Sequence, residues 1–256
     1  RAPHKPLLLL FAIGRLHRAG TSRVTYVDAE EPMQQLLRAY GPAGRDTTPA
    51  YPFHHLQTDG LWVVATTDGS DPGSAVGRLR SSGATGQLSP ALEAALLADP
   101  RLMALAVRVL LDENFPESLH ADICRMIGID VEALEIGIAQ ERAAGLVTAR
   151  RRDPRFRNDV LVAYEFRCAI CRYDGRIGNE AVGLDAAHVR WWAFDGPDSI
   201  DNGLCLCSMH HKLFDRGVIG ITGDLTVQVS RHFVGHSDAA TELVLRHAGR
   251  ARADPP

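Results

Sequence analysis

The chain has 256 residues, enough for one large domain or two ordinary ones. With 45% hydrophobic and 23% charged residues it has the balance of a soluble globular protein, and its net charge of −3 does not by itself indicate nucleic-acid binding, which depends on local clusters. The apolar run from Leu7 to Ile13 is far too short to cross a bilayer, and no cleavage-site pattern follows it, so we expect neither a membrane span nor a signal peptide.

The first half of the chain is predicted to be rich in helices. Apolar spacing and helix-end residues favour helices over residues 3–19, 28–40, 89–111, 116–127 and 131–144. A strand is expected over 61–66, after the turn at Asp59-Gly60. The Gly- and Ser-rich residues 68–87 are expected to form a surface loop.

A run of arginines separates the two halves of the chain. Its members are Arg150, Arg151, Arg152, Arg155 and Arg157. The run either contacts nucleic acid or forms a solvated linker. We therefore expect one domain over residues 1–140, a basic linker over 141–160 and a second domain over 161–256.

The second domain is predicted to contain mostly short elements. A helix is expected over residues 159–166, leading into a cysteine motif. Residues 168–229 are expected to form short strands and turns around one helix, with a hairpin over 219–229 that turns at Gly223-Asp224.

The five cysteines are distributed in a way that indicates metal binding. Four lie between positions 168 and 207, and Cys124 stands alone. An odd number of cysteines with tight local pairs favours metal ligation in a reducing compartment over a disulfide framework, so we expect a cytoplasmic protein.

The pairs Cys168-Ala-Ile-Cys171 and Cys207-Ser-Met-His210 share a two-residue spacing. That spacing lets both side chains of a pair reach one ion, and zinc takes four tetrahedral sulfur and nitrogen ligands. We therefore predict a structural Zn²⁺ site made of Cys168, Cys171, Cys207 and His210. Cys205 lies two residues before Cys207 on an expected strand and is expected to be a core residue, but in a different register Cys205 would replace Cys207 as the ligand.

Three segments of the second half share the pattern of a known nuclease family. They are Leu184-Asp-Ala-Ala-His188-Val-Arg-Trp191, Gly196-Pro-Asp-Ser-Ile-Asp-Asn202-Gly-Leu204 and His210-His211-Lys-Leu-Phe-Asp215. In this order they resemble the HNH endonuclease family, which has a ββα-metal fold, over about residues 165–222. The resemblance implies a catalytic set of His188, Asn202 and His211.

The chemistry of phosphodiester hydrolysis suits these residue types. A neutral imidazole can take a proton from water near neutral pH, so His188 is the expected general base. By resemblance, Asn202 fixes the loop that orients this base. A divalent cation must stabilise the charged transition state, and the resemblance gives His211 as its histidine ligand.

A carboxylate should join His211, because Mg²⁺ prefers oxygen ligands. Many members of the family carry Asp immediately before the catalytic histidine, where this chain has Ala187. Asp185 shares the strand face of Ala187 and is the best acidic candidate, whereas Asp215 is expected to be a structural partner. The expected catalytic metal is Mg²⁺ or Mn²⁺, and imidazole ligation would also suit Co²⁺ or Ni²⁺.

The N-terminal half carries a second resemblance. Its segments are His4-Lys5-Pro6-Leu-Leu-Leu-Leu-Phe-Ala-Ile-Gly-Arg15 and Ala50-Tyr51-Pro52-Phe53-His54-His55-Leu56, with Trp62 on the strand behind them. Over about residues 1–135 the chain resembles the sulfur-binding domains that are fused to HNH nucleases in McrA-like, modification-dependent restriction enzymes. That family recognises DNA in which sulfur replaces a non-bridging phosphate oxygen.

This second resemblance implies a shallow apolar cup for the sulfur atom. Sulfur is larger, more polarizable and less strongly hydrated than oxygen, so an apolar cup can accept it while charged residues hold the adjacent phosphates. Tyr51 and Pro52 would form the cup, with His55 at its edge. Contacts to the DNA backbone or base edges would come from His4, Lys5 and Arg80, with Arg78 as the alternative to Arg80.

Together these patterns predict an α+β protein with a helix-rich N-terminal DNA-reading domain and a C-terminal ββα-metal nuclease domain that carries a zinc knuckle. The predicted function is a restriction endonuclease that binds phosphorothioate-modified double-stranded DNA and hydrolyses phosphodiester bonds nearby. We expect a homodimer, because one active site per chain must cut two strands. One alternative is an HNH nuclease acting on methylated or unmodified DNA. Another is a catalytically inactive, zinc-stabilised DNA-binding protein, which the presence of His188, Asn202 and His211 disfavours.

Overall fold

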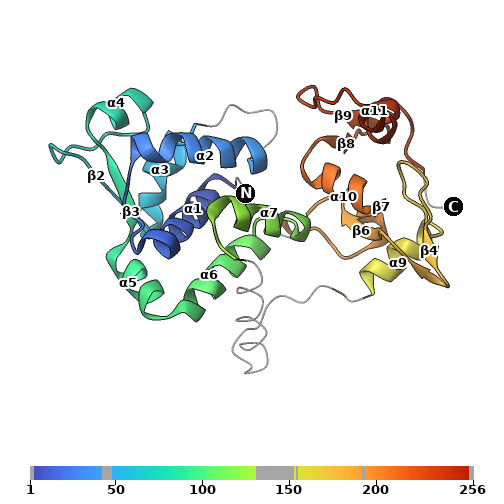
Figure 1. The fold of residues 1–256 in the computed structure, drawn as a ribbon, viewed down its shortest axis with the longest axis horizontal. Helices are drawn as coiled ribbons and strands as arrows, with labels where there is room; N and C mark the ends of the chain where they lie inside the picture. The colour runs from blue at the N-terminus through green and yellow to red at the C-terminus, as the bar shows by residue number, and fades with distance from the viewer. Residues whose placement is uncertain (1–2, 42–47, 131–152, 154, 192–193, 254–256) are drawn as a thin grey trace. The chain divides into compact units, whose positions relative to one another are not determined.

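The computed structural model describes residues 3–41, 48–130, 153, 155–191 and 194–253. The chain divides into two compact units, Arg1–Thr148 and Ala149–Pro256 (Figure 1). The helix expected over 131–144 and most of the basic linker lie outside the described residues. Among the helices of the described ranges, none has the length and hydropathy that crossing a membrane requires.

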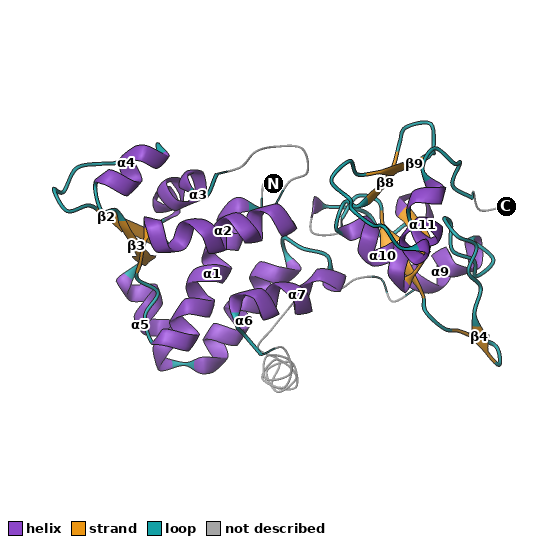
Figure 2. Cartoon of the chain, turned by 45° about the horizontal axis from the view of Figure 1, so that its top comes forward, coloured by secondary structure: helices purple, strands orange, loops and turns teal. Residues whose placement is uncertain are grey.

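The first unit is dominated by helices, which are purple in Figure 2. Its elements in chain order are α1 (His4–Ala19), β1 (Val24–Thr25), α2 (Tyr26–Tyr40), α3 (Ala50–His55), the 3-10 helix η1 (Leu56–Asp59), β2 (Trp62–Ala65), α4 (Val76–Ser81), β3 (Thr85–Leu88), α5 (Pro90–Ala98), α6 (Pro100–Asp112) and α7 (Glu117–Ile127). The strands form an antiparallel sheet in the order β1-β3-β2. The predicted helices over 3–19, 28–40 and 116–127 and the strand over 61–66 are confirmed to within two residues at each end.

Helix α1 forms the centre of this unit. Its apolar residues Leu7, Leu8 and Leu10 are fully buried, because α1 contacts α2, α3, α6 and α7. A helix that is apolar on all sides must be covered on all sides. Gly14 lets α1 approach α7 closely, since a Cβ atom there would lie 2.2 Å from the carbonyl oxygen of Ile127.

The single helix expected over 89–111 is wrong, because α5 ends at Ala98 and α6 begins at Pro100. Proline has no N–H to donate, and its ring clashes with the preceding turn of a helix. Asp99 caps the new helix by accepting a hydrogen bond from the backbone N–H of Arg101 at 2.9 Å. The helical spacing of apolar residues continues across this break, so the spacing alone predicts one continuous helix.

The surface loop expected over 68–87 is also wrong, since it contains α4 and most of β3. Leu79 anchors α4 with a fully buried side chain, and β3 is the central strand of the sheet. Gly86 lies in the middle of β3 and weakens the strand signal in the sequence. Its position requires glycine, because a Cβ atom would lie 2.2 Å from the ring of Trp62 and 2.8 Å from that of Phe53.

Replacing Gly86 by alanine is expected to destabilise the first unit by about 2 kcal/mol, because overpacking a filled core costs roughly this much. The rings of Trp62 and Phe53 are themselves almost fully buried and cannot move aside cheaply. Gly77 supplies the matched control: it is exposed on α4, and a Cβ atom added there would meet no atom within 4 Å. Gly77→Ala should be neutral or should stabilise by up to about 1 kcal/mol through helix propensity. Urea unfolding of both variants measures the difference, and equal midpoints would contradict this packing account.

The second unit contains shorter elements. They are α9 (Phe156–Ala163), β4 (Arg176–Ile177), β5 (Glu180–Ala181), β6 (Leu184–His188), the 3-10 helix η3 (Ile200–Asn202), β7 (Gly203–Cys207), α10 (Ser208–Asp215), β8 (Ile219–Ile221), β9 (Val227–Val229), α11 (Asp238–Leu243) and the 3-10 helix η4 (Leu245–His247). The hairpin predicted over 219–229 is confirmed as β8 and β9. The predicted α+β fold, with a helix-rich N-terminal region, is confirmed as well.

The β6–β7 hairpin and the following α10 form the ββα unit of this half. The strands pair antiparallel, with Leu184 opposite Cys207 and His188 opposite Gly203. Helix α9 packs on the hairpin, and Gly203 permits this approach because a Cβ atom there would lie 2.3 Å from a methyl group of Val160. The hairpin and helix therefore hold His188 at a strand end, next to the first turn of α9.

Helix α9 lies three residues earlier than the sequence predicts. The predicted range is 159–166, but the helix begins at Phe156 and ends at Ala163. The end is set by Glu165 and Phe166, which adopt positive φ angles of 51° and 56°. Such left-handed backbone cannot continue a helix, and it turns the chain towards Cys168.

Candidate functional site

Three cysteines and one histidine meet in the core of the second unit. The sulfur atoms of Cys168, Cys171 and Cys207 and a ring nitrogen of His210 all lie within 4.8 Å of one another. His210 Nδ1 lies 3.1 Å from the sulfur of Cys207 and 3.6 Å from that of Cys168. On its other side, His210 Nε2 donates a hydrogen bond of 2.8 Å to the carbonyl oxygen of Leu243. Nδ1 therefore has the lone pair that can bind a metal ion. The set fits a tetrahedral zinc ion.

The fold brings the two ligand pairs together through the β6–β7 hairpin. Cys207 ends β7, and His210 follows in the first turn of α10. The backbone N–H of Ala169, next to Cys168, donates a hydrogen bond of 2.8 Å to the carbonyl oxygen of Cys205. This hydrogen bond holds the Cys168–Cys171 pair next to β7, the strand that ends at Cys207.

All five cysteines lie in the part of the chain that the structure describes. Cys205 and Cys124 do not belong to this cluster. Burial raises the pKa of the Cys205 thiol to about 12 and that of the Cys124 thiol to about 11. Both thiols are therefore protonated core groups at neutral pH. The structure places Cys207, not Cys205, beside His210.

His188 is held at the end of β6 by an aromatic ring and a carboxylate. The ring of Phe156 stacks on the imidazole at 4.2 Å between centroids and an interplanar angle of 20°. The imidazole Nε2 lies 2.8 Å from Oδ1 of Asp198, and both side chains are largely buried, at 12% and 15% exposure. The other carboxylate oxygen of Asp198 accepts a hydrogen bond of 2.8 Å from the backbone N–H of Asp153.

Asn202 fastens the loop that connects the two strands. Its side-chain oxygen accepts a hydrogen bond from the backbone N–H of Arg190 at 2.8 Å, and its amide nitrogen donates to the carbonyl oxygens of Arg190 and Pro197, each at 3.0 Å. The residue is buried, so these bonds replace those it would make with water. This geometry suits the predicted role of fixing the loop behind the histidine.

His211 lies on α10 with a carboxylate on each side. Its Nε2 lies 3.3 Å from Oδ2 of Asp215, and its Nδ1 lies 4.0 Å from Oδ2 of Asp185. Asp185 is half-exposed and is also bound by Arg157, whose Nε lies 3.1 Å from Oδ1. An imidazole between carboxylates can hold Mg²⁺ or Mn²⁺. From the sequence we expect only a structural role for Asp215, yet its carboxylate lies closer to His211 than that of Asp185.

In the first unit, residues predicted to contact the sulfur atom or the DNA backbone gather around Tyr51. The Tyr51 ring is 52% exposed and lies 4.4 Å from the ring of His55 between centroids, with the ring of His4 edge-on at 6.3 Å. We call these three residues the Tyr51 cluster. Pro52, the other predicted member of the cup, is buried in α3. Tyr51 therefore offers exposed apolar surface at this place, whereas Pro52 does not.

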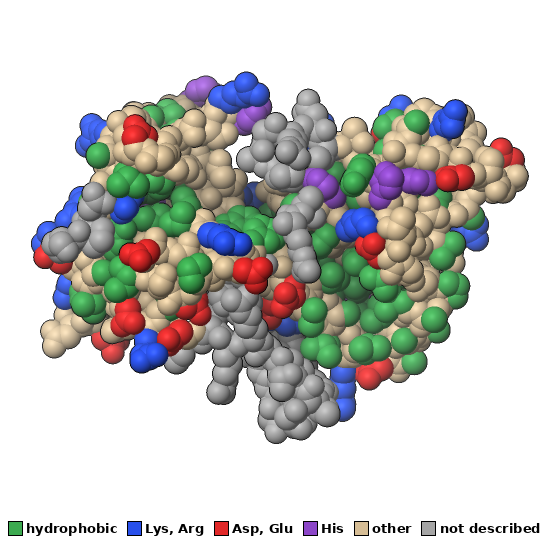
Figure 3. Space-filling view, turned by 180° about the vertical axis from the view of Figure 1, so that it is seen from behind, with side chains coloured by type: hydrophobic (Ala, Val, Ile, Leu, Met, Phe, Trp, Pro, Cys, Tyr) green, Lys and Arg blue, Asp and Glu red, His purple; other side chains and the backbone are tan. Residues whose placement is uncertain are grey.

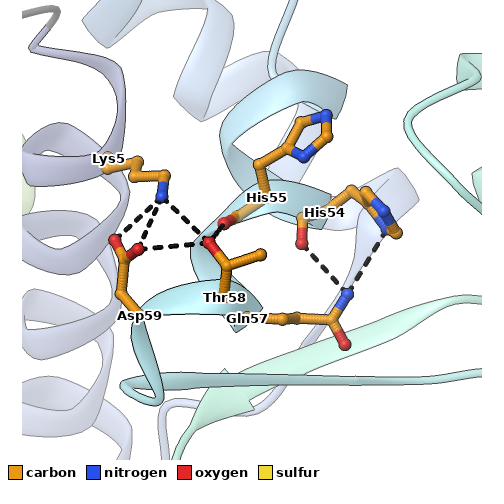
Figure 4. Close-up of polar contacts among 6 residues, drawn as sticks. All are labelled: Lys5, His54, His55, Gln57, Thr58 and Asp59. Carbon is orange, nitrogen blue, oxygen red and sulfur yellow. Dashed lines mark hydrogen bonds and ion pairs between the residues drawn. The ribbon is translucent and has the colours of Figure 1, made fainter.

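The predicted DNA-contacting cations have carboxylate partners. The ammonium group of Lys5 lies 2.7 Å from Oδ1 of Asp59 and 3.3 Å from Oγ1 of Thr58 (Figure 4). This bond lowers the pKa of the Asp59 carboxyl group, so this carboxylate is charged at neutral pH. Arg80 of α4 pairs with Glu30 at 2.8 Å rather than with the Tyr51 cluster. Arg78, the alternative to Arg80, lies on the same short helix.

Comparison with known protein families identifies the family to which the chain belongs. Residues 1–132, just over half of the chain, match the family described as ScoMcrA-like, DNA sulfur-binding domain. The chain belongs to this family. Residues 168–222 match the HNH endonuclease family, so the chain carries an HNH endonuclease domain and is a nuclease, as the sequence predicts. No curated protein matches it.

Several solved structures are similar to the chain. The sulfur-binding domain of SprMcrA complexed with phosphorothioated DNA has 23% identity and a TM-score of 0.44, covering 50% of this chain and 82% of that one. The corresponding ScoMcrA domain complex has 24% identity and a TM-score of 0.41, covering 51% and 85%. The type IV phosphorothioation-dependent restriction endonuclease ScoMcrA has 22% identity and a TM-score of 0.42, covering 72% of this chain and 43% of that one.

Within this sulfur-binding and HNH architecture, the structure reveals site residues that sequence reasoning misses. They are Asp198 and Phe156, which contact His188, and Asp59, which holds Lys5. Asp198 lies inside the Gly196–Leu204 segment that carries the HNH resemblance, so an acidic residue near Asn202 is a weak signal. Phe156 and Asp59 reach their partners only through the fold, and no local pattern points to either.

Proposed function

We propose that this protein is a modification-dependent restriction endonuclease that binds phosphorothioate-modified double-stranded DNA and hydrolyses phosphodiester bonds near the modification. We assign modification reading to residues 1–140 and cleavage to residues 161–256, joined by a basic linker over 141–160. The observation that carries this proposal is the match of residues 1–132 to the DNA sulfur-binding family in the same chain as an HNH domain.

The Tyr51 cluster is the surface that we assign to the sulfur atom. A half-exposed phenol ring flanked by His55 offers apolar, polarizable contact area, and sulfur interacts favourably with aromatic rings. Lys5 supplies positive charge for the flanking phosphates, and the preceding His4, which is largely buried beside this ring, would add a ring N–H donor. Arg80 would add a further phosphate or base contact from α4.

In the cleavage reaction, His188 accepts a proton from the attacking water. Asn202 keeps the loop around this base in place, so that the imidazole does not have to reorganise during the reaction. His211, with Asp185 and Asp215 beside it, would hold a catalytic Mg²⁺ or Mn²⁺ ion, with Co²⁺ or Ni²⁺ as other candidates. When bound, such an ion would supply positive charge that offsets the negative charge developing on the phosphate.

The Cys168, Cys171, Cys207 and His210 set would hold a structural Zn²⁺ ion that fastens the segment after α9 to the end of β7 and to α10. A thiolate zinc site with buried free thiols elsewhere suits a reducing compartment such as the cytoplasm.

We also propose that the protein acts as a homodimer. One HNH site per chain has to cut two strands, which a twofold pair of chains accomplishes directly. Figure 3 shows hydrophobic side chains gathered over the lower part of the first unit. Leu97 of α5 and Leu102 and Val109 of α6 are large apolar side chains that are 39–49% exposed, which is typical of interaction surfaces.

Competition binding tests the sulfur-reading role separately from cleavage. His188→Ala protein would be bound to a labelled phosphorothioate duplex and challenged with phosphorothioate, methylated and unmodified duplexes of one sequence. We expect the phosphorothioate duplex to compete about tenfold better or more, a difference of about 1.4 kcal/mol. Tyr51→Ala should remove this preference, and Val27→Ala, at an exposed apolar site on α2, should keep it. Equal competition by the unmodified or methylated duplex would favour the corresponding alternative target.

A further inference from the structure

The imidazole of His188 is oriented by a carboxylate outside the expected catalytic set of His188, Asn202 and His211. Asp198 Oδ1 lies 2.8 Å from Nε2 of His188, and the side chains of both residues are largely buried. The ring of Phe156 stacks on the imidazole and covers one of its faces. A short, shielded bond of this kind holds a ring in one orientation far better than an exposed ion pair does.

This bond also selects the tautomer of the imidazole. A carboxylate can only accept a hydrogen bond, so Nε2 must carry the proton that it donates to Asp198. In the neutral ring, Nδ1 is then the nitrogen with the lone pair, and it is the atom that can accept a proton from water. After that transfer the ring is a cation, and the adjacent carboxylate stabilises it.

The carboxylate of Asp198 is itself fixed from both sides. Its second oxygen accepts the backbone N–H of Asp153 at 2.8 Å. The preceding carbonyl, that of Pro197, accepts a hydrogen bond from the side chain of Asn202 at 3.0 Å. Asn202 therefore reaches His188 through the backbone next to Asp198, which gives this asparagine a concrete route for orienting the base.

We propose that Asp198 is the positioning residue of the catalytic histidine: it fixes the Nε2–H tautomer of His188 and stabilises the imidazolium ion that forms during DNA hydrolysis. The proposal rests on the proposed role of His188 as general base. Asp153 and Phe156 flank the start of α9, within the proposed linker over 141–160, so two groups that hold the base belong to the segment that leads into the nuclease domain.

The test uses single-turnover cleavage by four full-length variants: Asp198→Asn, His188→Ala, the double variant, and Asp201→Asn as a control. Asp201 is an exposed carboxylate in the same loop, so its replacement removes the same charge without touching the imidazole. We expect Asp198→Asn to cleave about 100-fold more slowly at saturating DNA, because general-base catalysis is worth about 10²–10⁴-fold. DNA affinity and zinc content should not change. Asp201→Asn should cleave at the wild-type rate.

The double variant distinguishes positioning from a purely structural role. If Asp198 acts through His188, then Asp198→Asn causes no further loss in the His188→Ala background. A further loss of the same size there, or wild-type cleavage by Asp198→Asn, would overturn the proposal while leaving His188 as the base. Wild-type cleavage by His188→Ala would instead remove the base assignment itself.

A measurement on the wild-type protein reports the tautomer of His188 directly. Nitrogen NMR of ¹⁵N-histidine-labelled protein, with His188 assigned by its disappearance in His188→Ala, reports which ring nitrogen is protonated. We expect the Nε2–H form for His188 and a shift towards Nδ1–H in Asp198→Asn. A wild-type ring protonated at Nδ1 alone would contradict the proposal.

Discussion

Replacing His188 by alanine is expected to slow DNA cleavage about 1000-fold, because general-base catalysis supplies about 10²–10⁴-fold. The loss should appear in the single-turnover rate and not in the affinity for DNA, since His188 is largely buried beneath Phe156 and lies in the nuclease unit. Gel-resolved cleavage with a filter-binding or fluorescence measurement of affinity separates the two quantities.

His236 is a suitable control for this experiment. It is an exposed histidine of the same unit, and His236→Ala should cleave at the wild-type rate. If His188→Ala cleaved as fast as the wild type, the base would have to be another residue. If both variants lost cleavage, the loss would reflect instability of the unit and not chemistry.

Replacing Cys168 by serine is expected to release the structural zinc ion and unfold the second unit. Zinc binding contributes about 10–16 kcal/mol of apparent free energy in small zinc domains, which matches or exceeds the total stability of about 5–15 kcal/mol of a typical domain. Cleavage should be lost, whereas binding of modified DNA through the first unit should persist. Metal analysis, circular dichroism and competition binding measure the three effects.

Cys205→Ala is the control for the zinc prediction, since Cys205 is buried beside the cluster without belonging to it. This variant should keep one zinc ion per chain and lose only packing energy. Loss of zinc in Cys205→Ala with retention in Cys207→Ala would show that Cys205 is the ligand. Retention of zinc in Cys168→Ser would contradict the proposed ligand set.

The sequence predicts the parts of the fold in which local signals and tertiary contacts agree. Helix α1 combines an unbroken apolar run with a glycine just past its end, and its predicted range is right to within one residue. The α5–α6 break and β3 escape prediction because tertiary contacts override the local signal there. Pro100 interrupts a continuous apolar pattern, and Gly86 is a poor strand former that the ring of Trp62 makes necessary.

In the candidate site, too, local sequence patterns predict some contacts, whereas contacts made only through the fold are not predicted. The two-residue spacing of Cys168 with Cys171 and of Cys207 with His210 is local, and the structure brings the four side chains together. Asp198 and Asp215 cannot be assigned to the site from the sequence, because an acidic residue in a loop or at a helix end has many possible partners. Their contacts with His188 and His211 follow from the β6–β7 register and the course of the intervening loop, which no short pattern specifies.

The measurement that tests the central claim most directly compares cleavage of two duplexes that differ only in phosphorothioate groups at defined positions. The wild-type protein would be incubated with each duplex in Mg²⁺ and in Mn²⁺, over several sequence contexts around the modification. Our account predicts that the modified duplex is cut near the modification while the unmodified one stays intact. Equal cleavage of both duplexes would contradict the sulfur-reading assignment and leave a nuclease of another specificity.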